Sequence, residues 1–231
     1  MRTAIENTRG KNVVEKSSNT EKPKRQRWTV TQKKIIPHEQ LVWVVKQLRE
    51  RAKSNRRYDV RRHFVFMLYL GSAVRNAEGC NLKIGDCAVS YNQDSLEVIN
   101  GKGGKDRLVI IDPNLKKLIK SWIKFRQEDE GVDGFDYDEP LIVSDRKTKY
   151  TPDGMLKLFK KIYKDFCLPE QYFVHTLRHC AISNWYRESK DLITCGRQAG
   201  HAHPSTTAVY SHVEDDEVRA IVKNSSKQFY R

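Results

Sequence analysis

A group of cationic, imidazole and phenol side chains between residues 75 and 210 has no obvious use in a protein core. Arg75 and Glu78 lie three residues apart, and so do His175 and Arg178, which places each pair on one face of a helix. Lys102 sits among glycines, where a long cation could swing into a groove. The full group consists of Arg75, Lys102, His175, Arg178, His201 and Tyr210.

These residue types fit chemistry at a phosphodiester without a metal ion. Guanidinium groups bind the non-bridging oxygens in pairs and offset the charge of a pentavalent transition state. A lysine can protonate the leaving oxygen, histidines can donate or accept protons, and a phenol can attack phosphorus. We therefore expect a site that needs neither a cofactor nor a metal.

A zinc site is the competing interpretation of the histidines. His175 and His179 have the i, i+4 spacing of a zinc pair, but Thr176 stands where the HExxH motif has its glutamate. The sequence offers no cysteine cluster to complete such a site. Hydrogen bonding within the structure is the simpler interpretation of His38, His63 and His203.

The elements that must position these residues are mostly helices. Helical spacing predicts helices over Pro37–Ala52 and Val60–Leu70, and from near Arg75 to before Gly85. Glycines 101, 103 and 104 predict a hairpin between strands Ser95–Asn100 and Arg107–Ile111. A further helix is expected from Pro113, and it is followed by an acidic loop over 128–140 and a short apolar run. The remaining helices are expected over Thr151–Phe166, His175–Glu188, Asp191–Ala199 and Pro204–Val213, and from Glu214. The sum is a mainly α, α+β fold with a small antiparallel sheet.

The charge distribution points to a polyanionic partner. The 231 residues carry a net charge of +14, and residues 1–36 hold ten basic and three acidic side chains. Nucleic acid is the leading candidate, because phosphate contacts dominate such binding. We expect DNA contacts from Lys105 and Arg107 and from four residues of a flexible arm at 1–35, namely Lys22, Lys24, Arg25 and Arg27. With no apolar run near 18 residues, we expect no membrane span.

In these motifs the chain resembles the tyrosine recombinases, the phage-integrase type of DNA breaking and rejoining enzyme. The resemblance covers about residues 35–215. Arg75 and Glu78 match the family's first box, Gly101–Arg107 its lysine hairpin, and His175-Thr176-Leu177-Arg178-His179 its second box. The last box is matched in order and spacing by Gly200-His201, Thr206-Thr207, Tyr210 and His212.

The resemblance implies a role for each matched residue. Tyr210 would be the nucleophile that forms a 3′-phosphotyrosyl bond, and Arg75 and Arg178 would bind the scissile phosphate. Lys102 would be the general acid for the 5′-oxygen, His175 would assist proton transfer, and His201 would hydrogen-bond the phosphate. Glu78 would support Arg75, and His179 would be structural.

Two stretches depart from the family pattern. Ser72-Ala73-Val74 stands where threonine-glycine-leucine usually precedes the arginine, and Ala199, after Arg197-Gln198, replaces a leucine before glycine-histidine. Only some 35 residues precede the catalytic pattern, which leaves two interpretations: a basic arm replaces the family's core-binding domain, or the chain is a catalytic-domain-only member. Two other functions are compatible with the fold: a type IB topoisomerase-like enzyme, or a DNA-binding protein without activity.

The resemblance also implies an assembly. Recombination needs four strand cuts, so four protomers should act on two duplexes carrying recombination sites, while the free protein should be monomeric or weakly associated. We expect a catalytic domain over 36–213 and a tail over 214–231, whose apolar strip Val218, Ile221 and Val222 packs either on its own domain or on a neighbouring protomer. The expected location is the cytoplasm of a prokaryotic host, with a virus as an alternative source of the gene.

Overall fold

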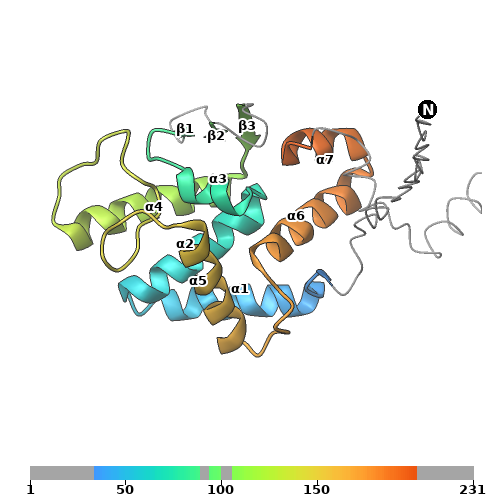
Figure 1. Ribbon diagram of the computed structural model, residues 1–231, viewed down its shortest axis with the longest axis horizontal. Coiled ribbons are helices and arrows are strands. Elements are labelled where there is room, and N and C mark those ends of the chain that lie inside the picture. The colour runs from blue at the N-terminus through green and yellow to red at the C-terminus, as the bar shows by residue number, and fades with distance from the viewer. Residues whose placement is uncertain (1–33, 89–93, 100–105, 202–231) are drawn as a thin grey trace, which may run out of the picture.

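The computed structural model describes residues 34–88, 94–99 and 106–201. Helix α2 (Arg57–Ser72) lies at its centre, packed against α1 (His38–Ala52), α4 (Pro113–Glu130) and α6 (Val174–Ser189) (Figure 1). Four apolar side chains of α2, at positions 64, 65, 66 and 68, are completely buried. Phe64 stacks on Trp122 of α4 with 4.8 Å between ring centroids. The buried side chains of α1, α4 and α6 therefore pack on α2 and form one hydrophobic core with it.

The remaining described elements are three helices and a small sheet. Helix α3 (Asn76–Asn81) follows α2 closely, α5 (Pro152–Asp165) packs on α3, and α7 (Leu192–Ala199) follows α6 (Figure 1). Strands β1 (Cys87–Ala88), β2 (Ser95–Val98) and β3 (Arg107–Ile110) form an antiparallel sheet in the order β1-β2-β3. Strand β3 lies next to α7, so the sheet and the last described helix meet beside α3.

Local signals in the sequence account for several helix starts. Thr151 and Asp191 cap α5 and α7 with their side-chain oxygens, and Asp112 does the same for α4. Pro113 and Pro152 occupy the first turn, where a missing N–H costs nothing. These three starts confirm the predicted helices, and the mainly helical α+β fold is confirmed with them.

Other boundaries differ from the prediction. Pro37 is the residue before α1 rather than its first residue, and α2 begins at Arg57, three residues before the predicted Val60. The acidic loop expected from 128 begins later, because α4 continues to Glu130. Arg57 binds Asp129 and Glu130, and these ion pairs explain why both helices are longer than their apolar pattern. The predicted helices after residue 201 lie outside the described residues.

In the described part of the chain, helices that are both long and apolar enough to cross a bilayer are absent.

Candidate active site

Arg75 is presented by the turn between α2 and α3. Helix α2 ends at Ser72, and Ala73 then takes a left-handed conformation with φ +50°. The backbone N–H of Arg75, at the start of α3, donates to Glu78 Oε2 at 2.7 Å. This is half of a capping box, so the glutamate three residues on also fixes the backbone that carries the arginine.

Glu78 is a buried carboxylate shared by two arginines. Its Oε1 accepts from Arg75 Nη1 at 2.7 Å and from Arg107 Nη1 at 2.9 Å. Its Oε2 accepts from Arg107 Nη2 at 2.8 Å. Burial opposes ionisation, but the hydrogen bonds from Arg107 and Arg75 prevail and lower the pKa of Glu78 to about 2. Glu78 is therefore charged at neutral pH and orients both guanidinium groups.

Backbone carbonyls at the end of α7 orient the two arginines of the first and second boxes. Arg75 Nη2 donates to the carbonyl of Gly200 at 2.7 Å, and Arg178 Nη2 donates to the carbonyl of Ala199 at 2.6 Å. Arg178 Nη1 donates to the carbonyl of Ala73. The last carbonyls of a helix lack intrahelical partners, so the end of α7 is a natural acceptor for cations. Ala73 after α2, Arg178 of α6 and Ala199 of α7 thus meet at one point.

The histidines surround this point in their neutral form. His175 lies one turn before Arg178 on α6, and His201 follows Gly200 directly. Partial desolvation and the nearby Arg178 and Arg75 cations lower the pKa of His175, and the same effects lower the pKa of His201 to about 4. Neutral imidazoles can both donate and accept a proton, which suits them to proton transfer.

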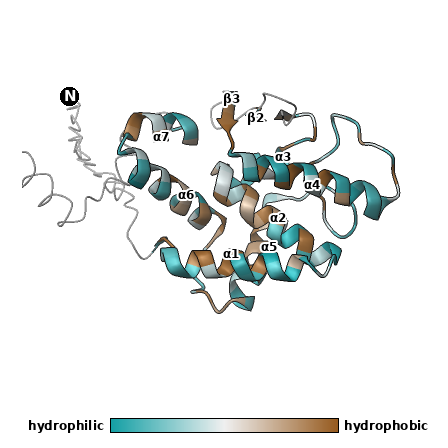
Figure 2. Ribbon diagram, turned by 180° about the vertical axis from the view of Figure 1, so that it is seen from behind, coloured by the Kyte–Doolittle hydropathy of each residue, from teal (hydrophilic) through white to brown (hydrophobic). Residues whose placement is uncertain are grey.

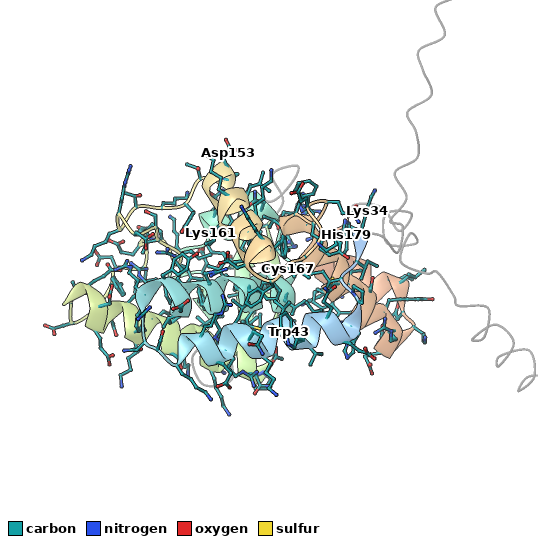
Figure 3. The ribbon with its side chains drawn as sticks, turned by 90° about the horizontal axis from the view of Figure 1, so that it is seen from below. Lys34, Trp43, Asp153, Lys161, Cys167 and His179 are labelled. Atoms are coloured by element: carbon teal, nitrogen blue, oxygen red, sulfur yellow. The ribbon has the colours of Figure 1, made fainter. Side chains whose placement is uncertain are left out.

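His179 is buried one turn further along α6, and its pKa is lowered to about 4 by burial and by neighbouring cations, Lys34 among them. Figure 3 shows Lys34 beside His179. His179 is buried, and the structural role expected for it stays a prediction.

The site is strongly cationic. The guanidinium groups of Arg75 and Arg107 bind the carboxylate of Glu78, and that of Arg178 binds the carbonyls of Ala73 and Ala199. Arg75 uses two of its five N–H donors on Glu78 and Gly200, so it has donors for an anion. Within the described residues, three or more side chains suited to ligating a metal do not come together. The arrangement can bind a phosphate and stabilise added negative charge on it.

The structure brings together Arg75, Glu78, His175, Arg178 and His201, as the sequence predicted. Arg107 joins them, although it was expected to contact DNA; its guanidinium lies on Glu78 instead, and a DNA contact stays a prediction. Lys102, Lys105, Tyr210 and the arm residues Lys22, Lys24, Arg25 and Arg27 lie outside the described residues.

Sequence reasoning missed two contributors. The carbonyls of Ala199 and Gly200 carry no side-chain signal, although Gly200 itself, at φ +69°, marks the end of α7. The side chain of Gln198 forms hydrogen bonds with Ile110 of strand β3. The sequence signal for this contact was a polar residue close to the position where the family has a leucine.

Comparisons with known proteins agree on one family. The model of the phage integrase family matches residues 36–217. The tyrosine recombinase XerA of Thermococcus onnurineus is 33% identical over 162 residues, covering 69% of this chain and 53% of the relative. XerC of Thermodesulfovibrio yellowstonii is 29% identical over 165 residues, covering 71% and 54%. The chain spans about half the length of the curated relatives it matches.

Solved structures share the fold at low sequence identity. A crystal structure of XerA recombinase superposes with a TM-score of 0.65 at 24% identity, covering 83% of this chain and 65% of the other. The Tn1549 transposon integrase, in complex with transposon right end DNA, gives a TM-score of 0.67 at 16% identity and covers 84% and 67%. The arrangement of helices around the small sheet is therefore that of these recombinases.

Proposed function

The chain belongs to the phage integrase family, and on that premise we propose that it is a site-specific DNA recombinase that cuts and rejoins strands through a 3′-phosphotyrosyl intermediate without metal or ATP. The observation that supports this most is the pair of guanidinium groups on Arg75 and Arg178. Neighbouring carbonyls at the end of α7 orient both of them toward the same place. Such a pair can bind two oxygens of one phosphate.

The proposed reaction uses the remaining residues as proton carriers. The oxygen of Tyr210 attacks phosphorus and its proton passes to the neutral imidazole of His175. As the new O–P bond forms, the bond to the 5′-oxygen breaks and Lys102 donates a proton to that oxygen. His201 donates a hydrogen bond to the phosphate. The tyrosyl phosphodiester retains the energy of the broken bond, so a 5′-hydroxyl can reverse the step without a nucleotide cofactor.

The partners proposed are double-stranded DNA sites and further copies of this chain. The solved Tn1549 integrase was bound to transposon end DNA, which supports DNA as the partner here. Four protomers on two duplexes would supply the four cuts, with the catalytic unit at 36–213, the arm at 1–35 binding phosphates and the tail at 214–231 joining neighbours. The site of action would be the cytoplasm of a prokaryote.

Trapping the covalent complex tests this proposal. A library of nicked duplexes with inverted repeats around a random spacer would be incubated with protein in EDTA, and adducts would be separated by denaturing electrophoresis. We expect an adduct with the wild type and with the control Tyr186→Phe, and none with Tyr210→Phe. An adduct formed by Tyr210→Phe, or loss of the wild-type adduct in EDTA, would refute the assignment. Relaxation of supercoiled plasmid without a recombination site would favour a topoisomerase instead.

A further inference from the structure

Strand β3 ends the described sheet, and one glutamine covers its outer edge. Ile110 pairs with Ser95 of β2, and its own N–H and C=O both bind the side chain of Gln198. The N–H donates to Gln198 Oε1 at 3.3 Å, and Gln198 Nε2 donates to the C=O at 2.6 Å. A side-chain amide has one donor group and one acceptor, so it satisfies this edge as a neighbouring strand would.

Side-chain packing contributes little to holding β3 in place on its outer face. Leu108 and Ile110 are 61% and 60% exposed, and the apolar colour of β3 is visible in Figure 2. Val109 alone among the three residues after Arg107 is buried. Polar contacts with α7 and with Glu78 therefore add to the pairing with β2 and the burial of Val109 in holding the strand.

Arg107 fixes the other end of the same strand. Its guanidinium binds Glu78 through both Nη atoms, and its side chain lies so close to Gly200 that a Cβ there would be 2.6 Å from Nε. These contacts form a closed loop of hydrogen bonds and backbone. Gln198 binds Ile110 at one end of β3, and Arg107 at the other end of β3 binds Glu78. Glu78 also binds Arg75, which donates to the carbonyl of Gly200, two residues after Gln198. The strand and the catalytic arginine are thus held at a fixed separation.

We propose that Gln198 is a positioning residue that sets β3, the strand that follows Lys102 in the sequence, relative to Arg75. Lys102 lies five residues before Arg107 in the sequence, so a displacement of β3 would also shift the end of the segment that carries Lys102. A leucine at 198 could make neither hydrogen bond to Ile110. This inference rests on the proposed function, because it assumes that Lys102 protonates the leaving oxygen.

The test compares two leaving groups. Cleavage by wild type, Gln198→Leu and Gln198→Glu would be measured on a normal suicide substrate and on one with sulfur as the 5′-leaving atom, which needs no protonation. Glutamate keeps an acceptor for the N–H of Ile110 but cannot donate to its C=O. Ile193→Gln is the matched control, because Ile193 is on the same helix and 76% exposed.

We expect both Gln198 variants to cut the normal substrate about 10-fold to 100-fold more slowly, the range that removal of one or two hydrogen bonds allows. On the sulfur substrate they should cut within a factor of about three of the wild type, and Ile193→Gln should match the wild type on both. DNA affinity should not change, and the melting temperature should fall by only a few degrees, as expected for the loss of one or two hydrogen bonds. These readouts separate a misplaced lysine from a damaged fold.

The Lys102→Ala variant distinguishes a failure of the inference about Gln198 from a failure of the proposed function. If sulfur rescues Lys102→Ala but leaves the Gln198 variants equally slow on both substrates, or if those variants cut the normal substrate at the wild-type rate, the role of Gln198 is refuted and the proposed function stands. If sulfur fails to rescue Lys102→Ala, the lysine of the proposed function is wrong, and the inference about Gln198 falls with it.

Discussion

Replacing Glu78 with glutamine should remove about 3 kcal/mol of stability at pH 7. The pKa of Glu78 falls from 4.5 to about 2 on folding, and each pKa unit corresponds to about 1.4 kcal/mol, so the charged form is favoured by roughly 3 kcal/mol in the native state. Removing one partner of a buried ion pair typically costs about 3–5 kcal/mol. Glutamine retains one carbonyl acceptor for the arginines, so we expect the lower end of that range.

The pH dependence of this difference is the sharper test. Because the pKa of Glu78 is depressed by folding, its contribution is complete above the unfolded value of 4.5 and is lost as pH falls toward 2. Urea unfolding of wild type and Glu78→Gln at pH 7, 5, 3.5 and 2.5 should show a difference in unfolding free energy that narrows steadily below pH 5. Other carboxylates titrate in the same range, but they are common to both proteins and cancel in the difference.

Glu128→Gln serves as the control for this experiment. The side chain of Glu128 is 64% exposed and 3.8 Å from Lys124, and a surface pair of that kind is worth about 1 kcal/mol or less. A destabilisation by Glu78→Gln that is the same at pH 7 and pH 2.5 would show that altered packing, not the missing charge, is responsible. Equal unfolding free energies of the wild type and Glu78→Gln at pH 7 would refute the assigned contribution of Glu78.

Two further predictions concern Gly200 and the arm. In a urea titration, Gly200→Ala should have a free energy of unfolding about 1–2 kcal/mol lower than that of Gly131→Ala, and it should cut DNA more slowly. Both glycines have left-handed φ values, +69° and +70°, but only a Cβ at position 200 would meet Arg107. Equal effects of the two substitutions would contradict this steric conflict. Removal of residues 1–27 should weaken binding to all DNA sequences and make the salt dependence shallower by about 0.9 for each phosphate that the arm no longer neutralises. Titrations at several salt concentrations measure this slope, and unchanged binding would mean that the arm does not contact phosphates.

The sequence predicted helices best where a cap and an apolar stripe coincide. Thr151 with Pro152 marked the start of α5, and Asp191 marked that of α7. Boundaries set by tertiary ion pairs were missed: Arg57 reaches Asp129 and Glu130, more than 70 residues away, and extends both helices. Strand β1 was also missed, because a two-residue strand has no detectable period and depends on pairing with β2.

The candidate site was predicted as a set of residues but not as a set of contacts. Side-chain spacing brought Arg75 to Glu78, whereas the hydrogen bond from Arg75 to the carbonyl of Gly200 spans 125 residues and has a backbone acceptor. Ala73 shows how a departure from the family pattern is accommodated. It adopts the left-handed conformation that glycine prefers, at a cost of about 1 kcal/mol, while its buried methyl group packs with those of Ala181 and Ala199.

Under the proposed mechanism, the charge of the described part of the site would favour the transition state over the bound substrate. Carbonyl groups orient Arg75 and Arg178 without cancelling their charge, and Glu78 offsets one of the three guanidinium charges, which leaves about two positive charges. A phosphodiester carries one negative charge, and in the proposed attack the oxygen of Tyr210 brings a second as its proton passes to His175. His201, with a pKa of about 4, adds no positive charge at neutral pH before DNA binds. If the proposed function is correct, the site would match the doubly charged transition state better than the singly charged ground state, which is the condition for accelerating the reaction rather than only binding DNA.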